Sequence, residues 1–253
     1  MTKHLYIPDV QFRPGDNVDF LRSIGNYIIN KTPDVVICGG DFADMPSLSS
    51  YDVGKKAYEG RRYVKDIEAV HEAMEALLSP LAAYNDMQRR NKKRAYTPRM
   101  VMTLGNHENR INRAVNSDAK LEGILSTDDL SYSDFGWEVF PFLEVVIIDG
   151  IAYSHYFVTG VAGRPASSAQ AQFRKTNMSC VAGHQQGLHI HTGSRADGAR
   201  LTSIIAGSCY EHDEDYLSPQ GNKHWRGILM LHEVNNGEFD LMPVSLDYLK
   251  KNY

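Results

Sequence analysis

The stretch Gly105-Asn106-His107-Glu108 directly follows an apolar run, residues 99–104, that is typical of a buried β-strand. Upstream, a second apolar run ends in Gly40-Asp41, and a third ends in Asp9-Val10-Gln11. Three expected strands therefore deliver polar side chains to their carboxyl ends. In an open α/β sheet, ligands bind at this edge. The pattern predicts both a fold class and the place of its site.

The residue types at these strand ends indicate a metal centre. Clustered carboxylates, an amide oxygen and imidazoles suit a hard or borderline divalent ion such as manganese, iron(II), zinc or magnesium. A divalent ion held at the edge of a sheet can activate water and polarise a phosphoryl oxygen. The chemistry that follows from the pattern is metal-assisted hydrolysis.

Length and composition fit a globular enzyme. The chain has 253 residues, 42% of them hydrophobic, and a formal charge of -4. We expect one domain over residues 1–253, since large α/β domains reach this size. The charge gives no support to a general nucleic-acid binder, which is usually basic, although a local basic groove stays open. The oligomeric state stays open as well.

The sequence indicates a cytoplasmic protein that does not cross a membrane. No apolar run approaches the roughly 18 residues of a membrane span. The first residues lead straight into a strand, so we expect no signal peptide. Cys38, Cys180 and Cys209 are odd in number and not closely paired, which favours a reducing compartment.

The order of elements predicts a four-layer sandwich. The first half is expected to be β-α-β-α-β, with helices over 17–30, most of 55–93 and about 109–116, and a break or kink at Pro80. The second half is mostly strand, with hairpin turns at Asp149-Gly150 and at Asn235-Asn236-Gly237, and with a loop at 158–168 near the site. The expected strands are 5–10, 35–39, 99–104, 137–148, 151–157, 179–183, 201–206, 227–234 and 238–244. An α/β fold with an α-β-β-α sandwich of two mixed sheets flanked by helices accommodates this change of pattern.

Five polar clusters in a fixed order resemble the calcineurin-like metallophosphoesterase superfamily. They are Asp9-Val10-Gln11, Gly40-Asp41-Phe42-Ala43-Asp44, Gly105-Asn106-His107-Glu108, His155 and Gly183-His184-Gln185-Gln186. The family has Asp-x-His, Gly-Asp-x-x-Asp, Gly-Asn-His-Asp/Glu, a lone His and Gly-His-x-His. The resemblance covers about residues 5–191. Residues 40–52 look most like phage-encoded members, which would place the protein in a host cytoplasm.

The resemblance implies two divalent ions that share Asp41. One ion would also bind Asn106, His155 and His184, and the other would bind Asp9 and the residue at position 11. We expect manganese first, with iron, zinc, nickel or magnesium as alternatives. The activity implied is hydrolysis of a phosphomonoester or phosphodiester by a metal-bound hydroxide.

The resemblance also implies an acid for the leaving oxygen. His107 would take this role, oriented from behind by Glu108 or Asp44. Arg110 lies about one helical turn further on, from where its guanidinium could reach a substrate phosphate.

Two positions depart from the family pattern. Gln11 and Gln186 stand where relatives have His, and both fall on the same ion. An amide oxygen is neutral and binds transition metals more weakly than imidazole does. His189 or His191 could replace the missing imidazole if the 184–191 segment bends back. We therefore expect one complete metal position and one depleted one.

Other interpretations remain open at this stage. Asp9 could be a turn residue, Asn106 the N-cap of a helix, and His155 a structural residue of a strand. The acidic stretch 211–215 could be a loop over the site or an ordinary polar loop. As a whole, the chain could be a binding protein on a degenerate scaffold or a nuclease of the same superfamily. Loss of imidazoles at one ion fits the first alternative, but the other site residues of the pattern all remain, which speaks against it: Asp9, Asp41, Asn106, His107, His155 and His184. The acidic charge gives no support to the second alternative.

Overall fold

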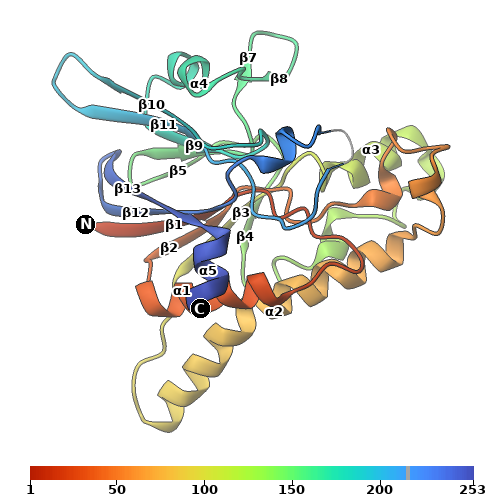
Figure 1. The fold of residues 1–253 in the computed structure, drawn as a ribbon, viewed down its shortest axis with the longest axis horizontal. Helices are drawn as coiled ribbons and strands as arrows, with labels where there is room; N and C mark the ends of the chain where they lie inside the picture. The colour runs from red at the N-terminus through yellow and green to blue at the C-terminus, as the bar shows by residue number, and fades with distance from the viewer. Residues whose placement is uncertain (215–216) are drawn as a thin grey trace.

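Two β-sheets lie face to face between layers of helices in the computed structural model (Figure 1), which describes residues 1–214 and 217–253. The predicted four-layer sandwich of two mixed sheets is confirmed. In Figure 1 the first sheet lies above α1, α2 and α5, and the second sheet lies between the first sheet and α4. No helix in the described parts of the chain is both long and apolar enough to cross a bilayer.

The first sheet has the strand order β13-β12-β1-β2-β3-β4. Its central strands β1, β2, β3 and β4 are parallel, and β12 and β13 add an antiparallel edge. The strands are β1 (Thr2–Ile7), β2 (Val35–Cys38), β3 (Arg99–Thr103), β4 (Glu138–Phe140), β12 (Gly227–Asn235) and β13 (Glu238–Ser245). The parallel strands bring their carboxyl ends to one edge.

The second sheet has the order β10-β11-β9-β6-β5. Strands β6, β9 and β11 are parallel to one another, and β5 and β10 are antiparallel edge strands. The strands are β5 (Val146–Ile148), β6 (Ile151–Tyr153), β9 (Cys180–Ala182), β10 (His189–Ser194) and β11 (Arg200–Ile205). Two short strands, β7 (Val158–Thr159) and β8 (Arg164–Pro165), pair separately, within the segment expected to be a loop.

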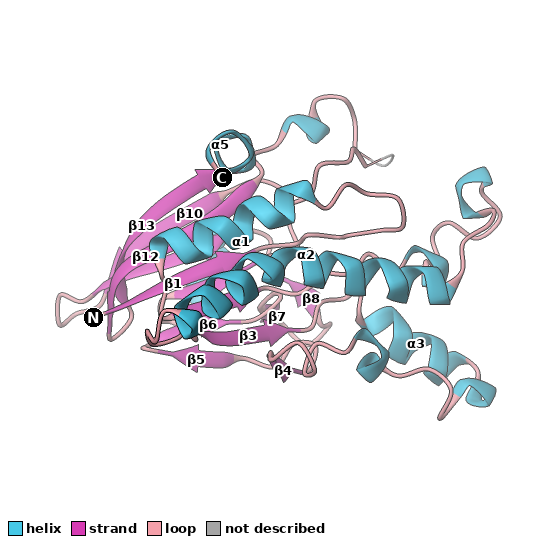
Figure 2. Ribbon diagram, turned by 90° about the horizontal axis from the view of Figure 1, so that it is seen from below, coloured by secondary structure: helices cyan, strands magenta, loops and turns pink. Residues whose placement is uncertain are grey.

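The helices cover the outer faces of the two sheets unequally. Helices α1 (Asp19–Lys31), α2 (Tyr63–Arg90) and α5 (Leu246–Asn252) cover the first sheet, and Figure 2 shows α1 and α2 side by side. On the second sheet, α4 (Ala169–Thr176), which the sequence did not predict, packs on β9, β10 and β11. Helix α3 (Asn109–Ser117) follows β3, and the 3-10 turns are η1 (Pro46–Leu48), η2 (Lys56–Tyr58), η3 (Ala119–Leu121), η4 (Thr127–Leu130) and η5 (Gly221–Lys223).

Alternating side chains of the central strands build two hydrophobic cores. Leu5 and Ile7 of β1 pack against the helices, whereas Tyr6 points into the space between the sheets. In β2, Val36 belongs to the first core and Ile37 to the second. Strands that are buried on both faces have continuous apolar sequences. For this reason the central strands could be predicted from the sequence.

The expected strand over residues 137–148 is wrong. This segment forms β4 in the first sheet and β5 in the second, joined by a turn in which Glu144 N–H donates to Pro141 O at 3.0 Å. Pro141 has no N–H for a strand ladder, and Leu143 has a left-handed backbone (φ 69°). The chain therefore changes sheets here. Strand β6 also ends earlier than predicted, at Tyr153.

Of the break or kink predicted at Pro80, the break is wrong, since α2 is one helix on both sides of this residue. Proline leaves the carbonyl four residues earlier without its helical donor. That carbonyl belongs to Ala76, and the Ser79 hydroxyl donates to it at 3.1 Å. The helix starts at Tyr63 rather than near Lys55, where only the turn η2 forms.

Candidate metal centre

Five strand ends from the two sheets meet at one edge of the sandwich. Asp41 follows β2 and Asn106 follows β3 in the first sheet, while His155 follows β6 and His184 follows β9 in the second. Asp9 follows β1, beside β2. Because β1, β2 and β3 are parallel, and β6 and β9 are parallel, residues distant in sequence come together here.

Three of these residues form a group that could hold a metal ion. One ligand atom each from Asp41, His155 and His184 lies within 4.8 Å of the others. The Asn106 Oδ1 atom lies 2.9 Å from His155 Nε2 and 2.7 Å from His184 Nδ1. The four side chains therefore converge on one point, with the oxygen and nitrogen donors that a borderline divalent cation prefers.

The His155 ring is fixed by hydrogen bonds at both nitrogens. Its Nδ1 lies 2.8 Å from Gly39 O, and its Nε2 lies 3.3 Å from Asp41 Oδ2 as well as near Asn106. Burial disfavours the charged imidazole, but Asp41 beside it raises the pKa of His155 to about 10. The bond from Nδ1–H to a backbone carbonyl is a common support for a metal-binding histidine. A cation bound at Nε2 would take the place of the proton there.

Asp9 is buried, and its carboxylate is bound by the main chain of His184. The His184 N–H donates to both carboxylate oxygens, at 3.0 and 3.1 Å. Burial raises the pKa of Asp9 to about 7, and the nearby Asp41 adds to this effect. Gly183 is needed here, because a Cβ at that position would collide with Asp9 Oδ1. The two buried carboxylates are stabilised by nearby positive charge, which a divalent cation would supply.

Gln11 is buried with an amide oxygen that has no hydrogen-bond partner in the described part of the chain. Such an atom is costly unless it binds something, and an amide oxygen is an accepted ligand of divalent cations. The Gln11 N–H donates to Asp41 O at 2.7 Å, which ties the two loops together. The residues present therefore fit a metal at this position as well.

Three of the candidate ligands have a left-handed backbone. The φ angles of Gln11, Asp41 and His184 are 44°, 49° and 69°. Non-glycine residues in this region are uncommon, and they cluster at functional sites, where surrounding contacts hold them. This strain is independent support for the site, because it was not used to choose the residues.

The other histidines considered as replacements do not join the group. Among described residues, the potential metal-binding group contains neither His189 nor His191. The His191 ring packs against Phe173 of α4 at a centroid distance of 5.0 Å, on the outer face of the second sheet. Gln186 lies in the turn between β9 and β10.

His107 is held by Asp44, one of its two predicted supports. The His107 Nδ1 lies 2.8 Å from Asp44 Oδ1 and 3.0 Å from Asp44 O. Its Nε2 lies 3.7 Å from Asp41 Oδ2 and 3.2 Å from Arg110 Nη2. Although burial lowers the pKa of His107, Asp41 and Asp44 together raise it. Arg110 Nη1 donates to Asp44 O at 2.7 Å, which places its guanidinium beside His107.

The Glu108 carboxylate binds main-chain N–H groups and does not contact His107 through a hydrogen bond in the described part of the chain. Its Oε2 accepts from Asp41 N and Gly105 N, at 2.9 and 2.8 Å, and its Oε1 accepts from Ala43 N and Tyr132 Oη, at 3.0 and 3.2 Å. The side chain is fully buried. Glu108 is also the N-cap residue of α3, so the alternative that Asn106 fills this role does not hold.

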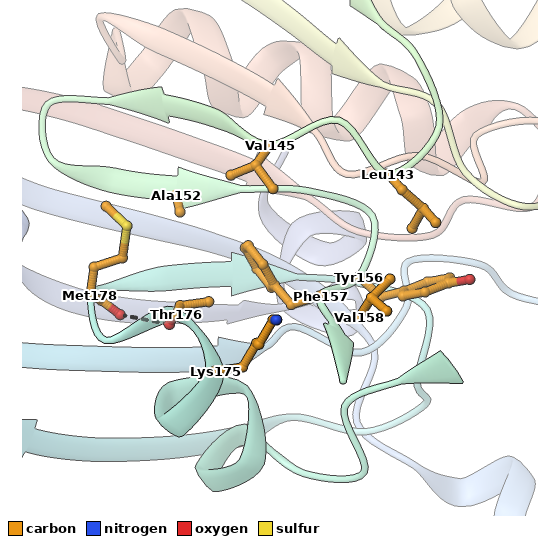
Figure 3. A pocket seen from close by; sticks show the side chains of 9 residues that line it. All are labelled: Leu143, Val145, Ala152, Tyr156, Phe157, Val158, Lys175, Thr176 and Met178. Atoms are coloured by element: carbon orange, nitrogen blue, oxygen red, sulfur yellow. Dashed lines mark hydrogen bonds between the residues drawn. The ribbon is translucent and has the colours of Figure 1, made fainter. Parts of the chain in front are cut away.

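Sequence analysis missed two further residues at the site. The Tyr156 ring lies 4.7 Å from the His184 ring and 5.7 Å from the His155 ring. It also lines a cavity of about 340 Å³ on the outer side of the second sheet, with mostly apolar neighbours (Figure 3): Leu143, Val145, Ala152, Phe157, Val158, Lys175, Thr176 and Met178. The second residue, Arg13, lies 3.7 Å from Asp44. In the sequence, the only signal for these two residues is their position: Arg13 lies two residues after Gln11, and Tyr156 directly follows His155.

The acidic stretch 211–215 partly approaches the site. Glu214 Oε1 lies 3.0 Å from Arg13 Nη2 and 2.8 Å from His212 Nε2. Glu211 and Asp213 instead form ion pairs with Lys250 and Arg226. Asp215 lies outside the described residues.

Residues 3–186 match the family model of the calcineurin-like phosphoesterases, and the chain belongs to this family. The family implies a metal-dependent phosphoester hydrolase. No curated protein matches the chain. Similar solved structures include Yfce, a phosphoesterase from E. coli, with 12% identity, a TM-score of 0.36 and coverage of 96% of this chain and 99% of Yfce. A further crystal structure shows 12% identity, a TM-score of 0.37 and coverage of 96% of this chain and 99% of its own.

Proposed function

We propose that the protein hydrolyses a phosphomonoester or phosphodiester with the help of two divalent ions, manganese first among them. The observation that carries this proposal is the convergence of Asp41, His155 and His184 within 4.8 Å at the shared edge of the two sheets. When bound, two such ions would activate a water molecule and stabilise the charge that develops on the phosphoryl oxygens.

The side chains divide between two metal positions. Asn106, His155 and His184 would hold one ion, and Asp9 and Gln11 the other. Asp41 lies between the two sets, because its carboxylate contacts His155 and its carbonyl accepts from Gln11 N–H. Gln186 is a further candidate ligand of the ion that Asp9 and Gln11 would hold.

The remaining residues position and move protons. We propose that His107 donates a proton from Nε2 to the leaving oxygen, while Asp44 accepts the bond from Nδ1 and so fixes the ring. Arg110 lies against both residues, where its guanidinium can also meet a phosphoryl oxygen. Glu108 keeps the Asp41 and Gly105 loops in register.

The test is hydrolysis of two chromogenic esters, p-nitrophenyl phosphate and bis(p-nitrophenyl) phosphate. With added manganese we expect turnover of at least one of them, and with a chelator we expect turnover to be lost and then restored by metal. The same assay with other divalent ions ranks the metals. Full activity in the presence of chelator would contradict the proposal. No hydrolysis at saturating metal would favour a binding protein on the same scaffold.

Gln11→His should strengthen the weaker metal position. Imidazole binds these ions more tightly than a neutral amide oxygen does. We therefore expect calorimetric titration of the wild type to show two unequal binding phases, with activity rising in the second. In Gln11→His the second phase should move to lower metal concentration. Gln170→His, an exposed change on α4, controls for an added imidazole and should leave both phases in place. Two equal tight sites in the wild type would contradict this prediction.

The compartment and origin are part of the same proposal. All three cysteines are buried and unpaired, which supports a reducing cytoplasm. The resemblance of residues 40–52 to phage-encoded members supports a phage gene acting in a host cell.

A further inference from the structure

The Asp44 carboxylate is buried among three basic side chains. Its Oδ1 lies 2.8 Å from His107 Nδ1 and 3.6 Å from Arg110 Nη1. Its Oδ2 lies 3.7 Å from Arg13 Nε. Only 11% of the Asp44 side chain is exposed, so the charge depends on these partners. His107 and Arg110 approach one oxygen, and Arg13 approaches the other.

Arg13 is itself held from the opposite side. Its Nη2 lies 3.0 Å from Glu214 Oε1, which also meets His212 Nε2 at 2.8 Å. The Glu214 main chain is fixed by Asn222, whose Oδ1 accepts from Glu214 N at 2.9 Å and whose Nδ2 donates to Glu214 O at 3.1 Å. The Arg13 guanidinium, on the loop after β1, therefore lies between two carboxylates: Asp44 on the loop after β2 and Glu214 on the segment after β11.

We infer that Arg13 is a positioning residue for the proton donor, acting through Asp44. A carboxylate can rotate about its terminal bond, and rotation would move Oδ1 away from His107. Arg13 opposes that rotation from the Oδ2 side, so Oδ1 stays on His107 Nδ1 and Nε2 stays directed into the site. Asp44, which holds the proton donor, is thus fixed through Arg13, and Arg13 in turn is held by Glu214, 201 residues further along the chain than Arg13.

This inference rests on the proposed phosphoesterase activity and predicts a selective defect. The acid matters most when the leaving oxygen is a poor leaving group, and acid catalysis contributes about 10²–10⁴-fold. In Arg13→Met we expect kcat for a phenyl ester to fall about tenfold, a part of that contribution. The p-nitrophenyl ester needs little protonation, and its kcat should change less than about twofold. KM and metal content should stay close to those of the wild type.

Three further variants sharpen the experiment. Arg13→Lys keeps the charge and should recover part of the lost rate on the phenyl ester. Glu214→Gln removes the anchor of Arg13 and should give the same selective defect in a weaker form. Arg22→Met removes an arginine from an exposed ion pair on α1 and serves as the matched control. Thermal unfolding of each metal-free variant separates a positioning defect from a general loss of folding.

The outcomes are distinguishable. Equal losses on both esters with a higher KM would show that Arg13 contacts the substrate phosphate, and unchanged rates on both would show that it has no part in catalysis. Either result overturns this inference and leaves the proposed function intact. A wild type that hydrolyses neither ester would instead remove the proposed function, and the inference would fall with it.

Discussion

Asp41→Asn is expected to remove nearly all activity while the fold is kept. Asparagine has the same shape, tolerates the left-handed backbone (φ 49°) and can still accept from His107 N–H, which donates to Asp41 Oδ1 at 2.8 Å. It lacks the negative charge and the second oxygen needed between two ions. Losing several kcal/mol of charge stabilisation corresponds to a fall in turnover of about 10³-fold or more.

Metal content and activity should fall together in this variant. Calorimetric titration with manganese should show weaker binding at both positions, because the two ligand sets share this carboxylate. Asp66→Asn is the matched control, since Asp66 is also a buried carboxylate but accepts from Ser47 N–H at 2.9 Å, outside the proposed ligand sets. Wild-type metal binding in Asp41→Asn would show that Asp41 does not bridge.

Much of the candidate site could be predicted because each candidate ligand closely follows a strand. An apolar run is visible in a sequence, and parallel strands bring the residues after them to the same edge. Asp41, Asn106 and His184 were identified in this way, and their convergence follows from the strand order of the two sheets. The assignment of each side chain to one metal position stays a prediction.

The supporting contacts could not be predicted, because they depend on loops rather than on strands. The Glu108 carboxylate bonds to main-chain groups of Asp41, Ala43 and Gly105, which no sequence pattern reveals. Arg13 meets Glu214 only because the loop after β1 and the segment after β11 lie together. Such pairs are determined by tertiary packing. The sequence alone does not distinguish a charged loop residue that is solvated from one that forms an ion pair.

The errors in secondary structure have a similar origin. The run over residues 137–148 is apolar enough for one strand, and only the Pro141 turn separates β4 from β5. Pro80 was expected to break or kink α2, but the helix continues through it, and the Ser79 hydroxyl replaces the missing donor. In both cases a single local feature overrode the average secondary-structure propensity of the segment.

His107→Ala is expected to show the second largest effect, and the size should depend on the substrate. The ring reaches the site from the turn after β3, with Nδ1 on Asp44 and Nε2 3.7 Å from Asp41 Oδ2. If Nε2 gives its proton to the leaving oxygen, its loss should cost about 10²–10⁴-fold on a phenyl ester. The loss should be far smaller on a p-nitrophenyl ester, whose leaving oxygen is stable without a proton.

Metal content decides between the two roles that a histidine in this position could have. A proton donor can be removed without changing metal affinity, so titration of His107→Ala should match the wild type. Removal of a metal ligand, in contrast, lowers metal affinity. Loss of metal in the variant would therefore show that His107 binds an ion. His107→Gln adds a second comparison, because it restores a polar side chain beside Asp44 without a group that can supply a proton near neutral pH. It should retain metal and show the same dependence on the leaving group as His107→Ala. Recovery of the phenyl ester rate in His107→Gln would contradict the role of proton donor, since it would show that a hydrogen bond alone is enough.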